Sequence, residues 1–175
     1  MYRFYKLNIM KKLSFLLLVL FVLFSGSVSA KDKEQDFSQT KISWDGPPEY
    51  EFKILECEGS TYTSIVYIKF AITHNLAHQY VELRGRNAYD RSGKNYYVNL
   101  FGYSSVGGYS FRSNIDRILK TDTESIVEAK VELNGKIENF DSVKLEFYIK
   151  KPYYNNGTYK LEFINLPIEW KFLNF

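Results

Sequence analysis

Hydrophobic and polar residues alternate along most of the chain that follows residue 49. Three runs are clearest, with an apolar side chain at every second position and a mostly polar one between: residues 66–73, 127–133 and 143–150. Successive side chains of a β-strand point to opposite faces of a sheet, so each run can bury one face and expose the other. The pattern is typical of antiparallel sheets with one face in a core and one in water.

Weaker runs predict further strands, separated by turn signals that contain glycine: residues 50–58, 80–89, 95–101 and 159–170. About seven short strands of this kind predict an all-β fold. We expect an immunoglobulin-like antiparallel β-sandwich. A small β-barrel is the alternative, because periodicity does not distinguish the two architectures. Residues 111–119 place Ile115, Ile118 and Leu119 on one side of a helical turn, which predicts one short helical crossover.

Three short pieces of the chain carry a resemblance to a known family. They are Ile-Thr-His-Asn at residues 72–75, Ala-Tyr-Asp-Arg-Ser-Gly-Lys-Asn-Tyr at residues 88–96, and Val-Lys-Leu-Glu-Phe at residues 143–147. The order of these pieces resembles that in secreted bacterial immunoglobulin-like β-sandwich domains related to the mycobacterial immunoprotective extracellular antigen. The resemblance implies this fold and export from the cell. It brings no catalytic residues, because the function of that family is largely unassigned.

The first thirty residues have the parts of a secretory signal peptide. An apolar run over residues 13–24 is followed by the small-residue ending Val28-Ser-Ala30, and four basic residues precede it: Arg3, Lys6, Lys11 and Lys12. The apolar run is about a dozen residues long, whereas a membrane-spanning helix needs roughly 20, so we expect cleavage rather than a retained anchor. Met10 also opens a complete signal peptide, so Met1 and Met10 are alternative starts.

We therefore predict a signal peptide at residues 1–30, a polar leader at 31–48 and one β domain at 49–175, in a periplasmic or extracellular protein. Four of the 23 Lys and Arg residues lie in the signal peptide, so the mature chain keeps 19 against 20 Asp and Glu, a formal net charge near −1 rather than +3. A near-neutral domain gives no reason to expect a nucleic-acid partner or stable membrane insertion after cleavage. The oligomeric state is open.

Cys57 is the only cysteine, so no internal disulfide can form and core packing must hold the fold. A lone cysteine is most often buried among apolar side chains, and we expect that here. The neighbouring carboxylates of Glu56 and Glu58 would raise the pKa of the thiol and lower its reactivity.

Two polar clusters are candidate metal sites. Asp90 begins an Asp-Arg-Ser-Gly-Lys-Asn segment, but it is the one carboxylate there and two cations accompany it, so a hairpin turn with Gly93 at positive φ is favoured over a calcium loop. His74 and His78 are the only histidines and are four residues apart, a spacing that binds metal on a helix. Here a loop is expected between them, so we predict polar loop histidines and neither a metal nor a cofactor.

Catalytic signals are weak. The Gly-Tyr-Ser-Ser-Val-Gly sequence at residues 102–107 lacks the spacing and the strand-to-helix context of a nucleophile elbow. Pairs of nearby acids, such as Glu49 and Glu51, are common on solvated strand faces, and a glycosidase needs two acids that face each other across a cleft. We predict a protein that is not an enzyme, with a hydrolase as the remote alternative.

The strongest binding signal is an excess of aromatic residues, with 15 Tyr and 14 Phe in 175 residues. Tyrosines in loops give large, stiff contact areas for sugars or proteins. The candidate ligand-binding residues gather around expected turns: Tyr97, Tyr103, Tyr109, Tyr153 and Tyr154. We predict a binding module that recognises a protein or a polysaccharide at the cell envelope. The alternative is a structural or assembly protein of the envelope that uses exposed strand edges.

Overall fold

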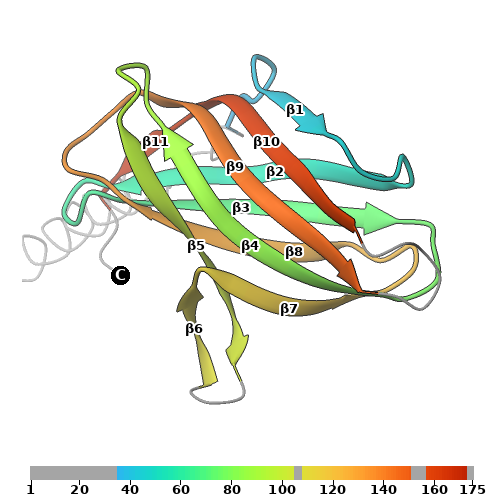
Figure 1. Cartoon of the computed structure of the whole chain (residues 1–175). Coiled ribbons are helices and arrows are strands. Elements are labelled where there is room, and N and C mark those ends of the chain that lie inside the picture. The colour runs from blue at the N-terminus through green and yellow to red at the C-terminus, as the bar shows by residue number, and fades with distance from the viewer. Residues whose placement is uncertain (1–34, 105–107, 151–156, 173–175) are drawn as a thin grey trace, which may run out of the picture. The chain divides into compact units, whose positions relative to one another are not determined.

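The computed structural model describes residues 35–104, 108–150 and 157–172, which belong to one compact unit (Figure 1). These residues contain eleven strands and no helix, so the predicted all-β class is confirmed. The predicted signal peptide lies outside the described residues. The strands are β1 (Lys41–Trp44), β2 (Tyr50–Ser60), β3 (Ile65–His74), β4 (Gln79–Tyr89), β5 (Asn95–Ser104), β6 (Gly108–Arg112), β7 (Asn114–Leu119), β8 (Ser125–Glu132), β9 (Asn139–Lys150), β10 (Gly157–Pro167) and β11 (Glu169–Lys171).

The strands form one curled sheet, which amounts to a half-barrel. Its order is β1-β10-β9-β4-β5-β8-β3-β2-β11, with β6 added beside β5 and β7 beside β4. All pairs are antiparallel except β11 with β2, which makes the sheet mixed. The eleven strands in one continuous sheet differ from the expected sandwich of about seven strands in two sheets.

Strand β5 joins the two halves of the curled sheet, and this is why the sheet does not divide. Its residues 95–97 pair with β4, and its residues 98–100 pair with β8. Gly85 on β4 makes the close approach possible, because a Cβ at this position would lie 1.9 Å from the Val98 carbonyl oxygen. The register of β4 against β9 also shifts between Gly85 and Ala88. A bulge of this kind bends the strand where the sheet curls.

The predicted helical crossover at residues 111–119 is wrong. This segment contains the end of β6 and the whole of β7, and β7 pairs with β4. The helical interpretation placed Ile118 beside Ile115 and Leu119. In the structure Ile115 and Leu119 are buried, whereas Ile118 is 55% exposed on the opposite face. Buried positions 115 and 119 fit both a helix and a strand, and pairing with β4 decides for the strand.

The compact unit begins at Gln35, ahead of the domain start predicted at residue 49. Strand β1, within the predicted leader, pairs with β10. The side-chain amide of Gln35 extends the edge of β2: its Oε1 accepts from Cys57 N at 2.9 Å, and its Nε2 donates to Cys57 O at 3.1 Å. The same Nε2 donates to Pro167 O at 3.1 Å, so Gln35 ties β2 to β10. Residues 35–48 are therefore part of the fold.

Aromatic and branched side chains fill the inside of the curled sheet. Its largest fully buried side chains are those of Phe70, Phe140, Phe147 and Phe163. Cys57 is also fully buried, as expected, and burial followed by the charge of Glu58 raises the pKa of its thiol. In the part of the chain that the structure describes, no helix has the length and apolar character to cross a membrane.

Candidate functional site

The segment that begins at Asp90 is a hairpin turn between β4 and β5, as predicted. The Asp90 carboxylate accepts hydrogen bonds from the backbone N–H groups of Ser92 at 2.9 Å and Lys94 at 3.1 Å, and from the Tyr96 hydroxyl at 2.9 Å. Gly93 has a φ of 78°. Hydrogen bonds, first from the Ser92 side chain and then from Tyr96, lower the pKa of Asp90. Burial, followed by the bond to Asp90, raises the pKa of Tyr96 to about 12.

The carboxylate of Asp90 is thus saturated by its own turn, which leaves it poorly placed to bind calcium. Among the residues that the structure describes, no group of three or more His, Cys, Asp or Glu side chains is arranged to hold a metal ion.

The structure places three of the five predicted tyrosines. Tyr97 lies on β5 and is 80% exposed, and Tyr109 lies on β6 and is 68% exposed. Tyr103 is opposite Tyr109 in the register of β5 and β6. Tyr153 and Tyr154 lie outside the described residues. The β5–β6 hairpin projects from the curled sheet in Figure 1, so it presents Tyr109 to solvent.

Next to this hairpin lies a groove that we call the aromatic groove. Its volume is about 290 Å³, and its lining residues come from β2, β3, β5, β6 and β8: Glu56, Glu58, Tyr67, Ile68, Lys69, Phe101, Phe111 and Glu128. The Phe101 ring stacks on Tyr109 with centroids 6.0 Å apart and an interplanar angle of 24°. The centroid of the Phe111 ring lies 5.2 Å from that of Phe101 and 5.9 Å from that of Tyr67. These contacts make a row of four rings that starts at Tyr109 and passes along the groove.

Ion pairs balance most of the charge in the aromatic groove. The Lys69 ammonium lies 2.8 Å from the Glu56 carboxylate, and this hydrogen bond is the main reason that the pKa of Lys69 is raised. Lys171 pairs with Glu58, again with a raised pKa for the lysine. The ammonium of Lys130 lies 5.3 Å from the centre of the Phe111 ring, a cation–π contact. The groove therefore combines aromatic faces with paired polar groups.

Sequence reasoning missed three of the four rings in the row. The alternation puts Tyr67 on the polar side of a strand, and the helical interpretation includes Phe111. Phe101 closed a predicted strand. The pairing of Phe101 with Phe111 across β5 and β6 joins two of these rings, and the pairing of β8 with both β3 and β5 brings Tyr67 beside them. A signal was present in the Tyr-x-Lys sequence of residues 67–69, because an aromatic ring on the face that carries charged residues lies outside the core.

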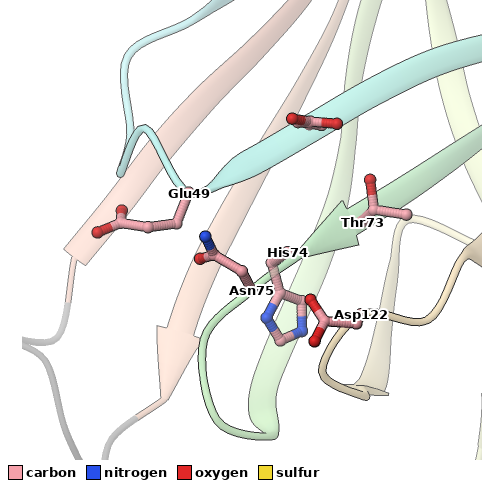
Figure 2. A pocket seen from close by; sticks show the side chains of 6 residues that line it. Glu49, Thr73, His74, Asn75 and Asp122 are labelled. Atoms are coloured by element: carbon pink, nitrogen blue, oxygen red, sulfur yellow. The ribbon is translucent and has the colours of Figure 1, made fainter.

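A second pocket, which we call the His74 pocket, lies where β3 ends. Its volume is about 340 Å³, and it is lined by Glu49, Glu51, Thr73, His74, Asn75 and Asp122 (Figure 2). The turn before β2, the strands β2 and β3, the loop between β3 and β4, and the turn between β7 and β8 supply these residues. The Asp122 N–H donates to the His74 carbonyl oxygen at 2.8 Å, which fixes the last of these turns against the end of β3.

The prediction that both histidines are polar loop residues is wrong for His74. It is the last residue of β3 and only 3% exposed, with its ring 5.3 Å from that of Tyr50. The alternation itself was a signal for this, because His74 continues the buried positions of the strand after Phe70 and Ile72. His78 is exposed and its Nδ1 lies 3.3 Å from the Thr121 hydroxyl. The two rings therefore have separate surroundings.

No family model matches the chain. No curated protein matches it either.

Proposed function

We propose that this protein is an exported binding module without catalytic activity, and that it recognises a polysaccharide, or a protein, through the aromatic groove and the tyrosines around it. The observation that carries the proposal is the row formed by Tyr109, Phe101, Phe111 and Tyr67. The first ring of the row, Tyr109, is 68% exposed, although burial of its apolar surface would stabilise the fold. Exposed rings beside a groove are typical of recognition surfaces.

A polysaccharide fits the groove better than a charged partner. Glu56 and Glu58 are paired with Lys69 and Lys171, so they offer hydrogen-bond acceptors without a strong negative field. Flat aromatic faces can stack on the apolar faces of sugar rings, while paired carboxylates and ammonium groups exchange hydrogen bonds with sugar hydroxyls. Tyr97, Tyr103, Tyr153 and Tyr154 stay part of the proposal as additional contact residues. The relation to secreted immunoglobulin-like domains is likewise a proposal.

The test is binding by the mature protein, residues 31–175, first on a glycan array and then by titration with the glycan that binds. Tyr109→Ala and Phe111→Ala each remove one ring of the row, and we expect each to weaken binding at least about 10-fold, equivalent to about 1.4 kcal/mol. Tyr80→Ala is the matched control, because Tyr80 is also exposed, at 51%, and does not line the groove. Equal affinity of all three variants and the parent protein would refute the proposed surface.

An envelope assembly protein is the second candidate, favoured by the free edges at the two ends of the sheet. One edge is β1, with four residues; at the other, β11 covers only Glu58–Ser60 of β2, so the first part of β2 also lies at the edge. Glu51 and Lys53 are exposed charged residues on that part of β2, and charged edge residues oppose pairing with another chain, which is why recognition is preferred. Sedimentation at high concentration separates the two candidates: a defined oligomer would support assembly, and a monomer would count against it.

A further inference from the structure

The His74 pocket has features of a binding site that the aromatic groove does not share. His74 is 3% exposed, and neither of its ring nitrogens has a hydrogen-bond partner among the described residues. The Glu49 Oε2 atom is buried and lacks a partner in the same part of the chain. Buried polar atoms without partners are destabilising by about 1–3 kcal/mol each. Their presence around one pocket indicates that the pocket is built to hold something polar.

The charge of the pocket selects the kind of ligand. Three carboxylates line it, from Glu49, Glu51 and Asp122, and no Lys or Arg is among its described lining residues. In Figure 2 the His74 ring lies beside the Asp122 carboxylate, with Glu49 and Asn75 on the other side of the ring. In its neutral form, an imidazole offers one acceptor and one donor. A cation that carries several N–H groups can donate to the imidazole acceptor and to the Asp122 carboxylate beside it, while Glu49, whose carboxylate points away from the ring in Figure 2, adds negative charge at the edge of the pocket.

We propose that the His74 pocket binds an organic cation with N–H donors, namely a guanidinium or a primary ammonium group. The pocket volume of about 340 Å³ has room for such a group and part of the molecule that carries it. Asn75 and Thr73 supply further polar side chains at the rim. The site is distinct from the aromatic groove, since the two share no lining residue.

A bare metal ion fits the pocket less well than an organic cation. Zinc needs three or four ligand atoms at roughly 2.0–2.3 Å. The lining acids are not clustered in this way, because no described group of three or more His, Cys, Asp or Glu side chains can hold a metal ion. A guanidinium group spreads its N–H donors over a wider area and therefore suits carboxylates that stand apart.

The histidines give a direct test, because the chain has two and only one lies in the pocket. The mature protein is labelled with ¹⁵N-histidine and titrated with methylguanidinium, methylammonium and tetramethylammonium chloride, while NMR follows the ring nitrogens. We expect saturable shifts of the His74 signals with one or both of the first two, and none with tetramethylammonium, which has charge but no N–H donor. The first two probes distinguish guanidinium from ammonium. The His78 signals should stay unchanged in all titrations.

Variants connect the signal with the lining acids. Glu51→Gln and Asp122→Asn each remove one negative charge, and we expect each to lower the affinity for the organic cation at least fivefold. Asparagine is chosen at position 122 because it tolerates the positive φ of 50° there. Asp141→Asn is the control: it also removes one negative charge, but Asp141 is exposed and does not line the pocket, so affinity should be unchanged. The absence of saturable His74 shifts would overturn the proposal. So would equal binding of tetramethylammonium, or tight binding of Zn²⁺ with no response to the organic cations.

Discussion

Replacing Trp44 with alanine should destabilise the whole β unit, although this residue lies in a segment that the sequence assigns to a leader. The Trp44 ring contacts four others: Phe52 at 5.0 Å, Phe147 at 5.2 Å, Tyr159 at 5.7 Å and Tyr50 at 5.8 Å between centroids. Its Nε1 also donates to Pro47 O at 2.8 Å. These contacts join β1 to β2, β9 and β10, so the indole connects strands from both ends of the curled sheet.

The expected loss follows from these contacts. Truncation of a buried Trp or Phe to alanine costs about 3–5 kcal/mol. Because Trp44 is half-buried, we expect the lower end, about 3 kcal/mol, which lowers the midpoint of thermal unfolding by roughly 10 °C for a domain of this size. Trp44→Phe keeps a ring and loses the hydrogen bond to Pro47, so it should cost about 1 kcal/mol.

Urea unfolding of residues 31–175, followed by circular dichroism, measures these differences through the shift in transition midpoint at constant slope. Tyr97→Ala serves as the control, because a side chain that is 80% exposed should change stability by less than about 0.5 kcal/mol. If Trp44→Ala costs less than about 1 kcal/mol, residues 35–48 do not contribute to the fold as the structure indicates, and the reasoning fails.

Two further predictions concern ionisable groups. Because the folded pKa of Asp90 is lowered, its contribution to stability is present above the unfolded pKa of about 3.9 and is lost as the pH falls through the lower folded value. The Asp90→Asn variant should therefore be less stable than the parent protein at pH 7, with a much smaller difference at pH 2. An equal difference at both pH values in urea titrations would contradict this. The Cys57 thiol is fully buried with a raised pKa, so it should react with a disulfide reagent only when the protein unfolds. Labelling at the same rate in buffer and in urea would disprove its burial.

Alternation predicts the strands in which every second side chain is buried. The runs at residues 66–73 and 143–150 became β3 and β9, since one face of each is buried. Alternation could not reveal β1, because four residues give too short a pattern. For β7, buried residues 115 and 119 have a spacing that a helix shares.

The candidate sites were harder to predict for a different reason. The turn of Asp90 could be predicted because its hydrogen bonds reach only Ser92, Lys94 and Tyr96. The aromatic groove depends on pairing between strands that are distant in the sequence. The His74 pocket also needs Asp122 from another turn. Sequence can show that an aromatic or a histidine is present, but long-range strand pairing decides its neighbours.

The link made by Gln35 has a consequence for the order of folding. The Gln35 amide and the Pro167 carbonyl are 132 positions apart in the chain, and β1 pairs with β10. Such distant contacts close large loops, so they form late and slow the search for the native state. Neighbouring hairpins such as β2–β3 and β9–β10 can form first. The contacts between the two ends of the described unit are therefore expected to form last, so the unit stays incomplete during synthesis until β10 has been made.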